Sequence, residues 1–166
     1  DEQEAFAAYD SCLQWKDDNV MALNNYAYYL SEKGVDLHKA ESMSYKTIKA
    51  EPNNGTYLDT YAWILFMEER YADAKTYIDQ ALKNRDSTAD NSTVLEHAGD
   101  IYYMNGMTDE SVDFWKKAYT GENQTEVLAW KIKNRQYITE EELKKRNAPK
   151  QKPAATKKSV RKGKKK

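Results

Sequence analysis

The run LNNYAYYL, at residues 23–30, contains the pattern from which the fold can be predicted. Its apolar and small residues recur at spacings of three, four and seven, which lie on one face of an α-helix. The same spacing returns as LDTYAWIL at residues 58–65 and as LEHAGDIY at residues 95–102. One helical face therefore occurs three times along the chain, which predicts a repeated helical unit.

A second series of small residues marks a partner for each of these helices. Ala5, Ala40, Ala74 and Ser111 follow one another at separations of 35, 34 and 37 residues. Small residues on facing helices allow two antiparallel helices to approach closely, while larger side chains fill the space beside them. Turn-forming runs such as EPNNG, at residues 51–55, separate one helix pair from the next. We expect helices at about residues 2–15, 20–33, 37–50, 55–68, 71–84, 92–105, 108–119 and 124–136.

These units resemble the tetratricopeptide repeat, a helix-turn-helix unit of about 34 residues. The resemblance covers roughly residues 5–119, as one second-helix half repeat followed by three whole repeats. The third unit, residues 95–119, follows the family pattern most closely. The first whole unit departs from it, because Ser44 and Thr47 stand where a large aromatic residue and an alanine are usual. The resemblance implies an all-α, right-handed solenoid of helical hairpins.

Three regions are expected along the chain: the repeat array at residues 1–119, a capping helix within 120–138 and a basic tail at 139–166. The capping helix departs from the repeat but carries Leu128 and Trp130 on an apolar side. A stacked array must cover its terminal apolar face, and this helix is predicted to do so. At the other end, the helix around Phe6 and Tyr9 lacks a preceding partner in the repeat pattern. Its exposed face is therefore expected to recruit missing repeats or a second copy.

The formal net charge of −1 conceals a strong asymmetry between the body and the tail. Residues 139–166 hold twelve Lys and Arg against three Glu, a net of +9, whereas the remainder carries −10. Residues 147–166 contain no acid and too few apolar groups to offset their ordering entropy, so they should be disordered unless something holds them. Three interpretations stay open: binding to nucleic acid, binding to an anionic membrane surface, or folding back onto the acidic body. The predicted tail contacts are Lys157, Lys158, Arg161, Lys162, Lys164, Lys165 and Lys166.

Motifs for catalysis and cofactor binding are absent from the sequence. It has no G-x-G-x-x-G, G-x-x-x-x-G-K-[ST], H-E-x-x-H or G-x-S-x-G stretch, so we predict neither an enzyme nor a cofactor. Glu96, His97 and Asp100 lie at helical ligand spacing, but they supply too few ligands for a zinc site, and no metal is predicted. Cys12 is expected to pack in the core, and a single cysteine excludes an internal disulfide.

In the tetratricopeptide family, the first helix of each unit lines a concave groove. This resemblance, carried over residue by residue, predicts a partner-binding groove formed by Asn24, Asn25, Tyr28, Asp59, Thr60, Trp63, Phe66, Met67, Glu96, His97, Asp100, Tyr103 and Met104. The set includes three acids and no Lys or Arg. Relatives that clamp the acidic C-terminal tails of chaperones use cations there. Burying a carboxylate without such cations would cost several kcal/mol, so that function is disfavoured.

Aromatic faces beside carboxylates suit a peptide that carries apolar anchors together with Lys or Arg. We therefore predict a non-catalytic interaction scaffold that binds a basic-aromatic partner, with Trp63 and Tyr28 as anchors and Asp59 and Asp100 as charge partners. Alternatively, these aromatic residues pack within the superhelix and bind nothing. Two other functions stay open: an adaptor that binds nucleic acid or another anionic polymer through its tail, or a structural spacer in a longer repeat protein.

The repeats also resemble the C-terminal repeats of long bacterial cell-envelope tetratricopeptide proteins, which are commonly made with a lipoprotein signal. That resemblance implies a longer parent protein in the periplasm or anchored to the outer membrane. The helical pattern that begins at residues 1–4 likewise predicts a missing preceding part. No apolar run reaches the roughly 20 residues of a membrane span, so this chain itself is expected to be soluble.

Overall fold

The structure, a computed structural model, describes residues 4, 7–9, 11, 19–120 and 123–148. Within these ranges the chain is helical and has no strand, as the repeat pattern predicts. None of the helices in these ranges has both the length and the apolar character needed to cross a membrane. The helices are α2 (Val20–Lys33), α3 (Leu37–Ala50), α4 (Gly55–Met67), α5 (Tyr71–Asn84), α6 (Ser92–Met104), α7 (Thr108–Ala118), α8 (Glu126–Asn134) and α9 (Glu140–Asn147).

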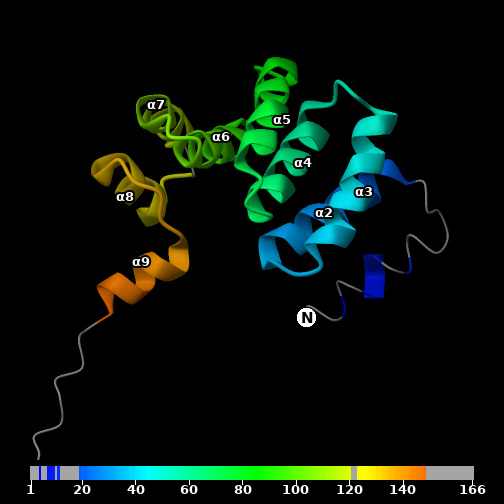
Figure 1. Cartoon of the computed structure of the whole chain (residues 1–166), viewed down its shortest axis with the longest axis horizontal. Coiled ribbons are helices and arrows are strands. Elements are labelled where there is room, and N and C mark those ends of the chain that lie inside the picture. Colours follow the sequence, from blue (N-terminus) through cyan, green and yellow to red (C-terminus); the bar gives the residue numbers. More distant parts are fainter. Residues whose placement is uncertain (1–3, 5–6, 10, 12–18, 121–122, 149–166) are drawn as a thin grey trace, which may run out of the picture.

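Three helical hairpins, α2–α3, α4–α5 and α6–α7, stack in chain order (Figure 1). Each hairpin contacts the next, since α3 packs against α4 and α5 packs against α6. The helix α8 packs beside α7 at the end of the stack, where the sequence predicts a capping helix. The all-α helical solenoid predicted from the repeats is confirmed.

Local capping explains where several helices begin and end. The side chain of Asn19 accepts a hydrogen bond from the backbone N–H of Ala22 at the start of α2, and Asn54 does the same for Thr56 and Tyr57 at the start of α4. Such caps satisfy backbone donors that have no partner within the helix. Gly34 ends α2 in the left-handed region, at φ 64°, where a residue without a Cβ is favoured.

The predicted helix crossings are confirmed for the described part of the chain. Ala40, Ala74 and Ser111 are all 0% exposed, each on the second helix of its hairpin. They lie within or beside the apolar clusters, so their small size lets the two helix backbones approach. The corresponding Ala5, together with the predicted core residue Cys12, lies outside the described residues.

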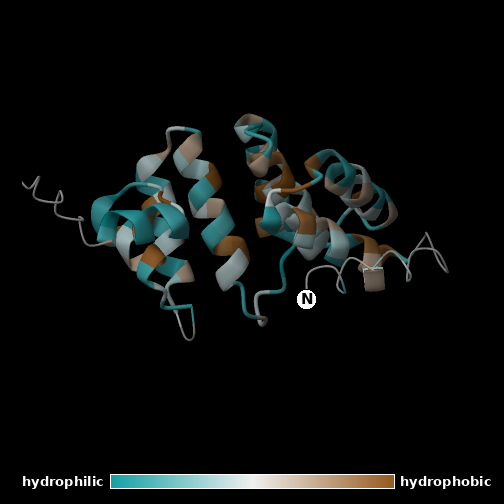
Figure 2. Ribbon diagram, turned by 90° about the horizontal axis from the view of Figure 1, so that it is seen from below, coloured by the Kyte–Doolittle hydropathy of each residue, from teal (hydrophilic) through white to brown (hydrophobic). Residues whose placement is uncertain are grey.

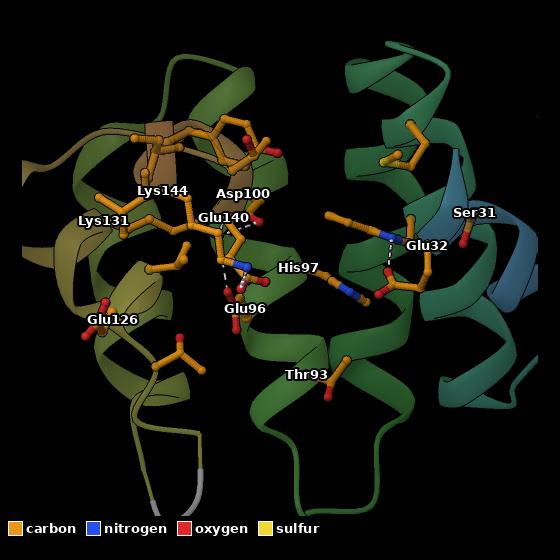
Figure 3. A pocket seen from close by; sticks show the side chains of 18 of the residues that line it. Ser31, Glu32, Thr93, Glu96, His97, Asp100, Glu126, Lys131, Glu140 and Lys144 are labelled. Carbon is orange, nitrogen blue, oxygen red and sulfur yellow. Dashed lines mark hydrogen bonds and ion pairs between the residues drawn. The ribbon is translucent and has the colours of Figure 1, made fainter. Parts of the chain in front are cut away.

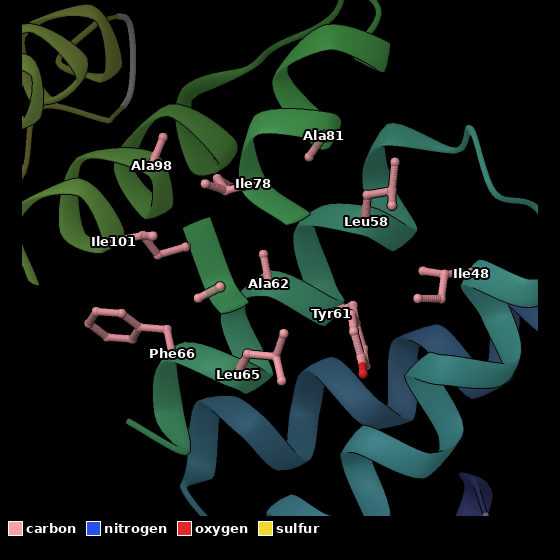
Figure 4. Packing of buried hydrophobic residues seen from close by; sticks show 11 residues of the cluster. Ile48, Leu58, Tyr61, Ala62, Leu65, Phe66, Ile78, Ala81, Ala98 and Ile101 are labelled. Atoms are coloured by element: carbon pink, nitrogen blue, oxygen red, sulfur yellow. The ribbon is translucent and has the colours of Figure 1, made fainter. Parts of the chain in front are cut away.

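The core runs through the junctions between hairpins. One apolar cluster combines residues from α3, α4, α5 and α6, among them Ile48, Leu65, Ile78 and Ile101 (Figure 4). Apolar residues gather on the helix sides that face one another, and polar residues gather on the outer sides (Figure 2). No single hairpin buries this cluster alone, so the stacking of repeats itself stabilises the fold.

The predicted boundary of the tail is wrong at its first residues. Residues 139–147, assigned to the basic tail, include the helix α9. Thr139 and Glu142 form a reciprocal capping box, and Leu143 is only 5% exposed. The reciprocal cap and the buried apolar residue both stabilise this short helix. Residues 149–166, including all seven predicted tail contacts, lie outside the described residues.

Removal of the cap should loosen α9 specifically. Thr139→Ala deletes the hydroxyl that accepts the Glu142 N–H, and such a loss costs about 1 kcal/mol. We expect faster hydrogen exchange at the amides of residues 140–147, with little change in α4 to α7. Thr139→Ser retains the hydroxyl and should exchange like the wild-type protein. Equal exchange in all three proteins would show that the capping box does not hold α9.

Candidate functional site

A groove lies between the first helices of the hairpins and the C-terminal pair α8–α9. Its volume is about 940 Å³. Figure 3 shows Glu32 and His97 on one side of this space, with Lys131 and Glu140 on the other. The first helices α2, α4 and α6 contribute their predicted concave faces, whereas α8 and α9 come from the part of the chain beyond the repeats.

The predicted groove residues fall into three groups. Six of them line this groove: Tyr28, Trp63, Met67, Glu96, His97 and Asp100. A second cavity of about 620 Å³, which Tyr28 also lines, contains four more: Asn24, Asn25, Asp59 and Thr60. The remaining three line neither cavity and pack against apolar clusters: Phe66, Tyr103 and Met104.

Aromatic rings form a stack along one side of the groove. The Trp63 ring lies between those of His97, with centroids 4.1 Å apart, and Phe66, at 4.7 Å, and it is nearly parallel to both. Its indole N–H donates to Glu32 Oε1 over 2.9 Å, which links α4 to α2. These contacts fix the Trp63 ring, but the side chain is only partly buried and still borders the groove. The stack thus offers an apolar surface that ends in a carboxylate.

Tyr28 borders both cavities and lies beside this stack. Its ring centroid is 6.2 Å from that of His97. Burial raises the pKa of the Tyr28 hydroxyl, and the nearby carboxylates Glu32, Asp59 and Glu96 raise it further. Tyr28 is therefore a neutral group at physiological pH that presents both a ring face and a hydroxyl.

The buried His97 is paired with Asp59. Its Nδ1 lies 3.0 Å from Asp59 Oδ1, and both residues are less than a tenth exposed. Burial disfavours the charged imidazole, but the charge and hydrogen bond of Asp59, together with the charges of Asp100 and Glu32, outweigh this effect and raise the pKa of His97. Asp59, predicted as a charge partner for a ligand, is thus already engaged within the protein.

This pair should make stability depend on pH in a defined direction. Because the pKa of His97 is raised above its ordinary value of about 6.5, the pair contributes fully below that pH and is lost as pH rises through the folded-state pKa. We therefore expect the free energy of unfolding to fall as the pH rises above about 6.5. His97→Gln, which can still donate to Asp59, should reduce this fall. Urea unfolding of both proteins tests this, and equal falls would exclude His97 as its source.

A buried cation, Lys131 of α8, closes the far end of the groove. Its Nζ lies 2.8 Å from both carboxylate oxygens of Asp100 and 3.2 Å from Glu96 Oε1. The Trp115 indole also donates to Asp100 Oδ1 over 2.8 Å. Burial raises the pKa of Asp100, and Lys131 opposes this effect. Asp100 is 3% exposed, and like Asp59 it is already engaged within the protein.

The segment between α8 and α9 covers part of the predicted binding surface. The Tyr137 ring packs edge-on against Phe66, with centroids 5.7 Å apart, and it also contacts Tyr103. Ile138 beside it is 2% exposed. The chain therefore places its own cation and its own aromatic ring against acids and rings of the predicted groove. Residue patterning within the repeats misses this segment, because it lies outside them.

The second cavity is rich in amides. Among the described residues, six asparagines line it, from α2, from the end of α5 and from the turns that precede α4 and α6: Asn24, Asn25, Asn53, Asn54, Asn84 and Asn91. Asn24 is 5% exposed, and within the described residues its Oδ1 has no hydrogen-bond partner. This cavity is chemically suited to polar groups. The described residues contain no cluster of three or more His, Cys, Asp or Glu that could hold a metal ion.

Comparison with known proteins agrees with this architecture. No family model matches the chain. Over 66 residues it is 35% identical to a TPR repeat-containing protein of Pseudomonas aeruginosa, a match that covers 40% of this chain and 11% of that protein. The chain thus matches only about a tenth of that relative's length.

A solved structure shares the fold. The chain is similar to the NMR structure of the first TPR domain of the human RPAP3 protein, with a TM-score of 0.59 and 13% sequence identity. The similarity covers 70% of this chain and 88% of that domain. At this identity the similarity establishes the fold alone. The repeated helical face, the buried small residues at the crossings and the match to a repeat protein agree with this similarity: the chain has the fold of a tetratricopeptide-repeat domain.

Proposed function

We propose that this chain is a non-catalytic interaction scaffold whose groove binds a protein segment carrying aromatic and basic residues. Tetratricopeptide repeats are in general protein-interaction scaffolds, and the finer proposal concerns the chemistry of the partner. The observation that carries it is the pairing of aromatic surface with carboxylates along one groove. Trp63 and Tyr28 supply ring surface, while Glu32, Glu126 and Glu140 are exposed carboxylates along its walls.

Contacts within the chain support this preference. Lys131 lies against Asp100 and Glu96, and Tyr137 lies against Phe66, so one basic and one aromatic side chain already occupy the far end of the groove. A partner of the same chemistry would extend these contacts toward α2 and α4. Ring burial would stabilise such a complex, and the exposed carboxylates would add cation attraction and faster association.

Isothermal titration calorimetry with a defined probe tests the proposal. The probe is a short peptide that alternates arginine and phenylalanine, and its counterparts replace either arginine by glutamate or phenylalanine by serine. We expect binding of the first peptide only. Trp63→Ala should weaken it about tenfold or more, because the central aromatic anchors of an interface contribute most of its affinity.

Trp130→Ala is the matched control, because Trp130 contacts Arg146 on α9 and does not line the groove. It should leave the affinity unchanged. Equal binding of all three peptides, or equal weakening by the two tryptophan variants, would contradict the proposal.

The parent protein is proposed to be a longer bacterial repeat protein of the cell envelope. The matched relative is bacterial and much longer than this chain, which supports a longer bacterial parent protein. The resemblance of the repeats to cell-envelope proteins supports the location in the envelope. Fractionation of cells that make the full-length protein would test it, with a cytoplasmic location as the contradicting result.

A further inference from the structure

The described chain ends at the wall of the groove. Asn147, the last residue of α9, and its C-cap Ala148 both line that cavity. The next eighteen residues, 149–166, therefore begin at the groove rather than at a distant surface. Fully extended, they could span about 60 Å, so their length does not prevent them from reaching α2 on the opposite wall.

The groove is acidic where it meets this segment. Among the described residues, five carboxylates and two ammonium groups line it, leaving His97 aside. Lys131 is engaged by Asp100 and Glu96, and Lys144 lies 2.5 Å from Glu140. The cations of the groove are thus already neutralised by acids of their own helices and neighbours. A surplus of negative charge remains along the walls.

The segment carries the complementary charge. Residues 149–166 contain nine Lys and Arg and no Asp or Glu. We propose that this segment binds back into the groove of its own chain and competes there with the external partner; this inference rests on the proposed function of the groove. A tethered segment acts at an effective concentration in the millimolar range, so weak contacts suffice for partial occupancy. Because the walls are open to solvent, salt should weaken this binding.

Crosslinking within the full chain tests the inference without any partner. A carbodiimide reagent joins an ammonium group to a carboxylate that it contacts and adds no spacer. We expect links from Lys157 or Lys158 to Glu32 or Glu96, because these cross the groove rather than join sequence neighbours. Their yield should not depend on protein concentration, and it should fall at high salt. Absence of such links, or a yield that rises with protein concentration, would overturn the inference.

Matched substitutions sharpen this test. Glu32→Gln with Glu126→Gln removes two carboxylates from the groove and should lower the yield of the remaining links from the segment to Glu96. Glu110→Gln with Asp113→Gln removes two exposed carboxylates from α7, neither of which lines the groove, and should not change it. An equal effect of both pairs would contradict docking in the groove.

Truncation after Ala148 tests the competition. We expect the arginine-phenylalanine probe to bind the truncated protein several-fold more tightly at low salt, with the difference lost at high salt. An unchanged affinity together with absent crosslinks would overturn the tail inference while the proposed groove function stands. If the probe binds neither protein, the proposed function fails, and the crosslinks alone then decide whether the segment docks.

The same proteins distinguish docking from an outward role of the segment. If it docks, heparin and the groove compete for it, so Glu32→Gln with Glu126→Gln should strengthen retention on heparin. Retention that is lost on truncation but unaffected by these substitutions would overturn docking in favour of an anionic-polymer function.

Discussion

Replacement of Lys131 by methionine is expected to destabilise the protein by about 3–5 kcal/mol, the typical cost of removing one partner from a buried ion pair. Lys131 is 3% exposed, and its ammonium group contacts both oxygens of a carboxylate that is itself 3% exposed. Methionine retains the length and apolar stem but leaves Asp100 buried without its cation. Urea unfolding monitored by circular dichroism at neutral pH measures the loss.

Two further variants isolate the buried charge as the cause. Asp100→Asn combined with Lys131→Met removes both charges and should recover a substantial part of the stability, since no unpaired charge remains buried. Arg135→Ala removes the cation of an exposed ion pair with Asp109 and should change stability by less than about 1 kcal/mol. If Lys131→Met has an equally small effect, the buried cluster does not hold α8 on the array.

Gly99→Ala is expected to destabilise the protein by about 3 kcal/mol, since overpacking a rigid core forces side chains and backbone to shift. A Cβ at this position would lie 2.2 Å from Cδ1 and 2.4 Å from Nε1 of Trp115. The Trp115 ring is fully buried and donates to Asp100, so it cannot move without breaking that hydrogen bond. Thermal and urea unfolding both report the loss.

The test is whether Gly99→Ala lowers or raises the free energy of unfolding. In an open helix, a glycine-to-alanine change stabilises by about 1 kcal/mol through helix propensity. Ser42→Ala, on the exposed side of α3, serves as a reference for a tolerated alanine substitution and should have a small effect. Stabilisation by Gly99→Ala would mean that Trp115 does not pack on the α6 backbone as described.

The repeat array is the part of the structure that the sequence predicts best. Residues that pack against one another lie at nearly constant spacing, so the buried Ala40, Ala74 and Ser111 could be recognised from their intervals. Each boundary of α2 to α7 agrees with its prediction to within about one residue. The spacing of apolar and small residues within each repeat determines these helices, and a sequence shows this spacing directly.

The contacts of the C-terminal helices cannot be predicted from the spacing of the repeats. Lys131 lies outside the repeats and is buried against Asp100, 31 residues earlier in the chain. Its partner lies within a repeat, so no periodicity links the two. The sequence does contain a signal for this contact. Glu96 and Asp100 are four residues apart on a concave face, and together these two carboxylates require a cation.

Helix α9 is missed because of the charged composition of its segment, and not because its contacts are distant in the sequence. The Thr139-x-x-Glu142 spacing is a capping signature, and a buried leucine follows it. Averaging the charge over residues 139–166 concealed this local signal. The sequence predicts the aromatic part of the site better. It assigns Tyr28, Trp63 and His97 to the concave face, and all three line the groove.

The central claim, that this groove is the partner-binding surface, is tested most directly by nuclear magnetic resonance. The arginine-phenylalanine probe is titrated into the isotope-labelled protein, and the shifted resonances are mapped onto the structure. We predict the largest shifts at the Trp63 indole, at Tyr28 and at His97. Shifts confined to the outer helices α3, α5 and α7, or no shifts at saturating probe, would contradict the claim.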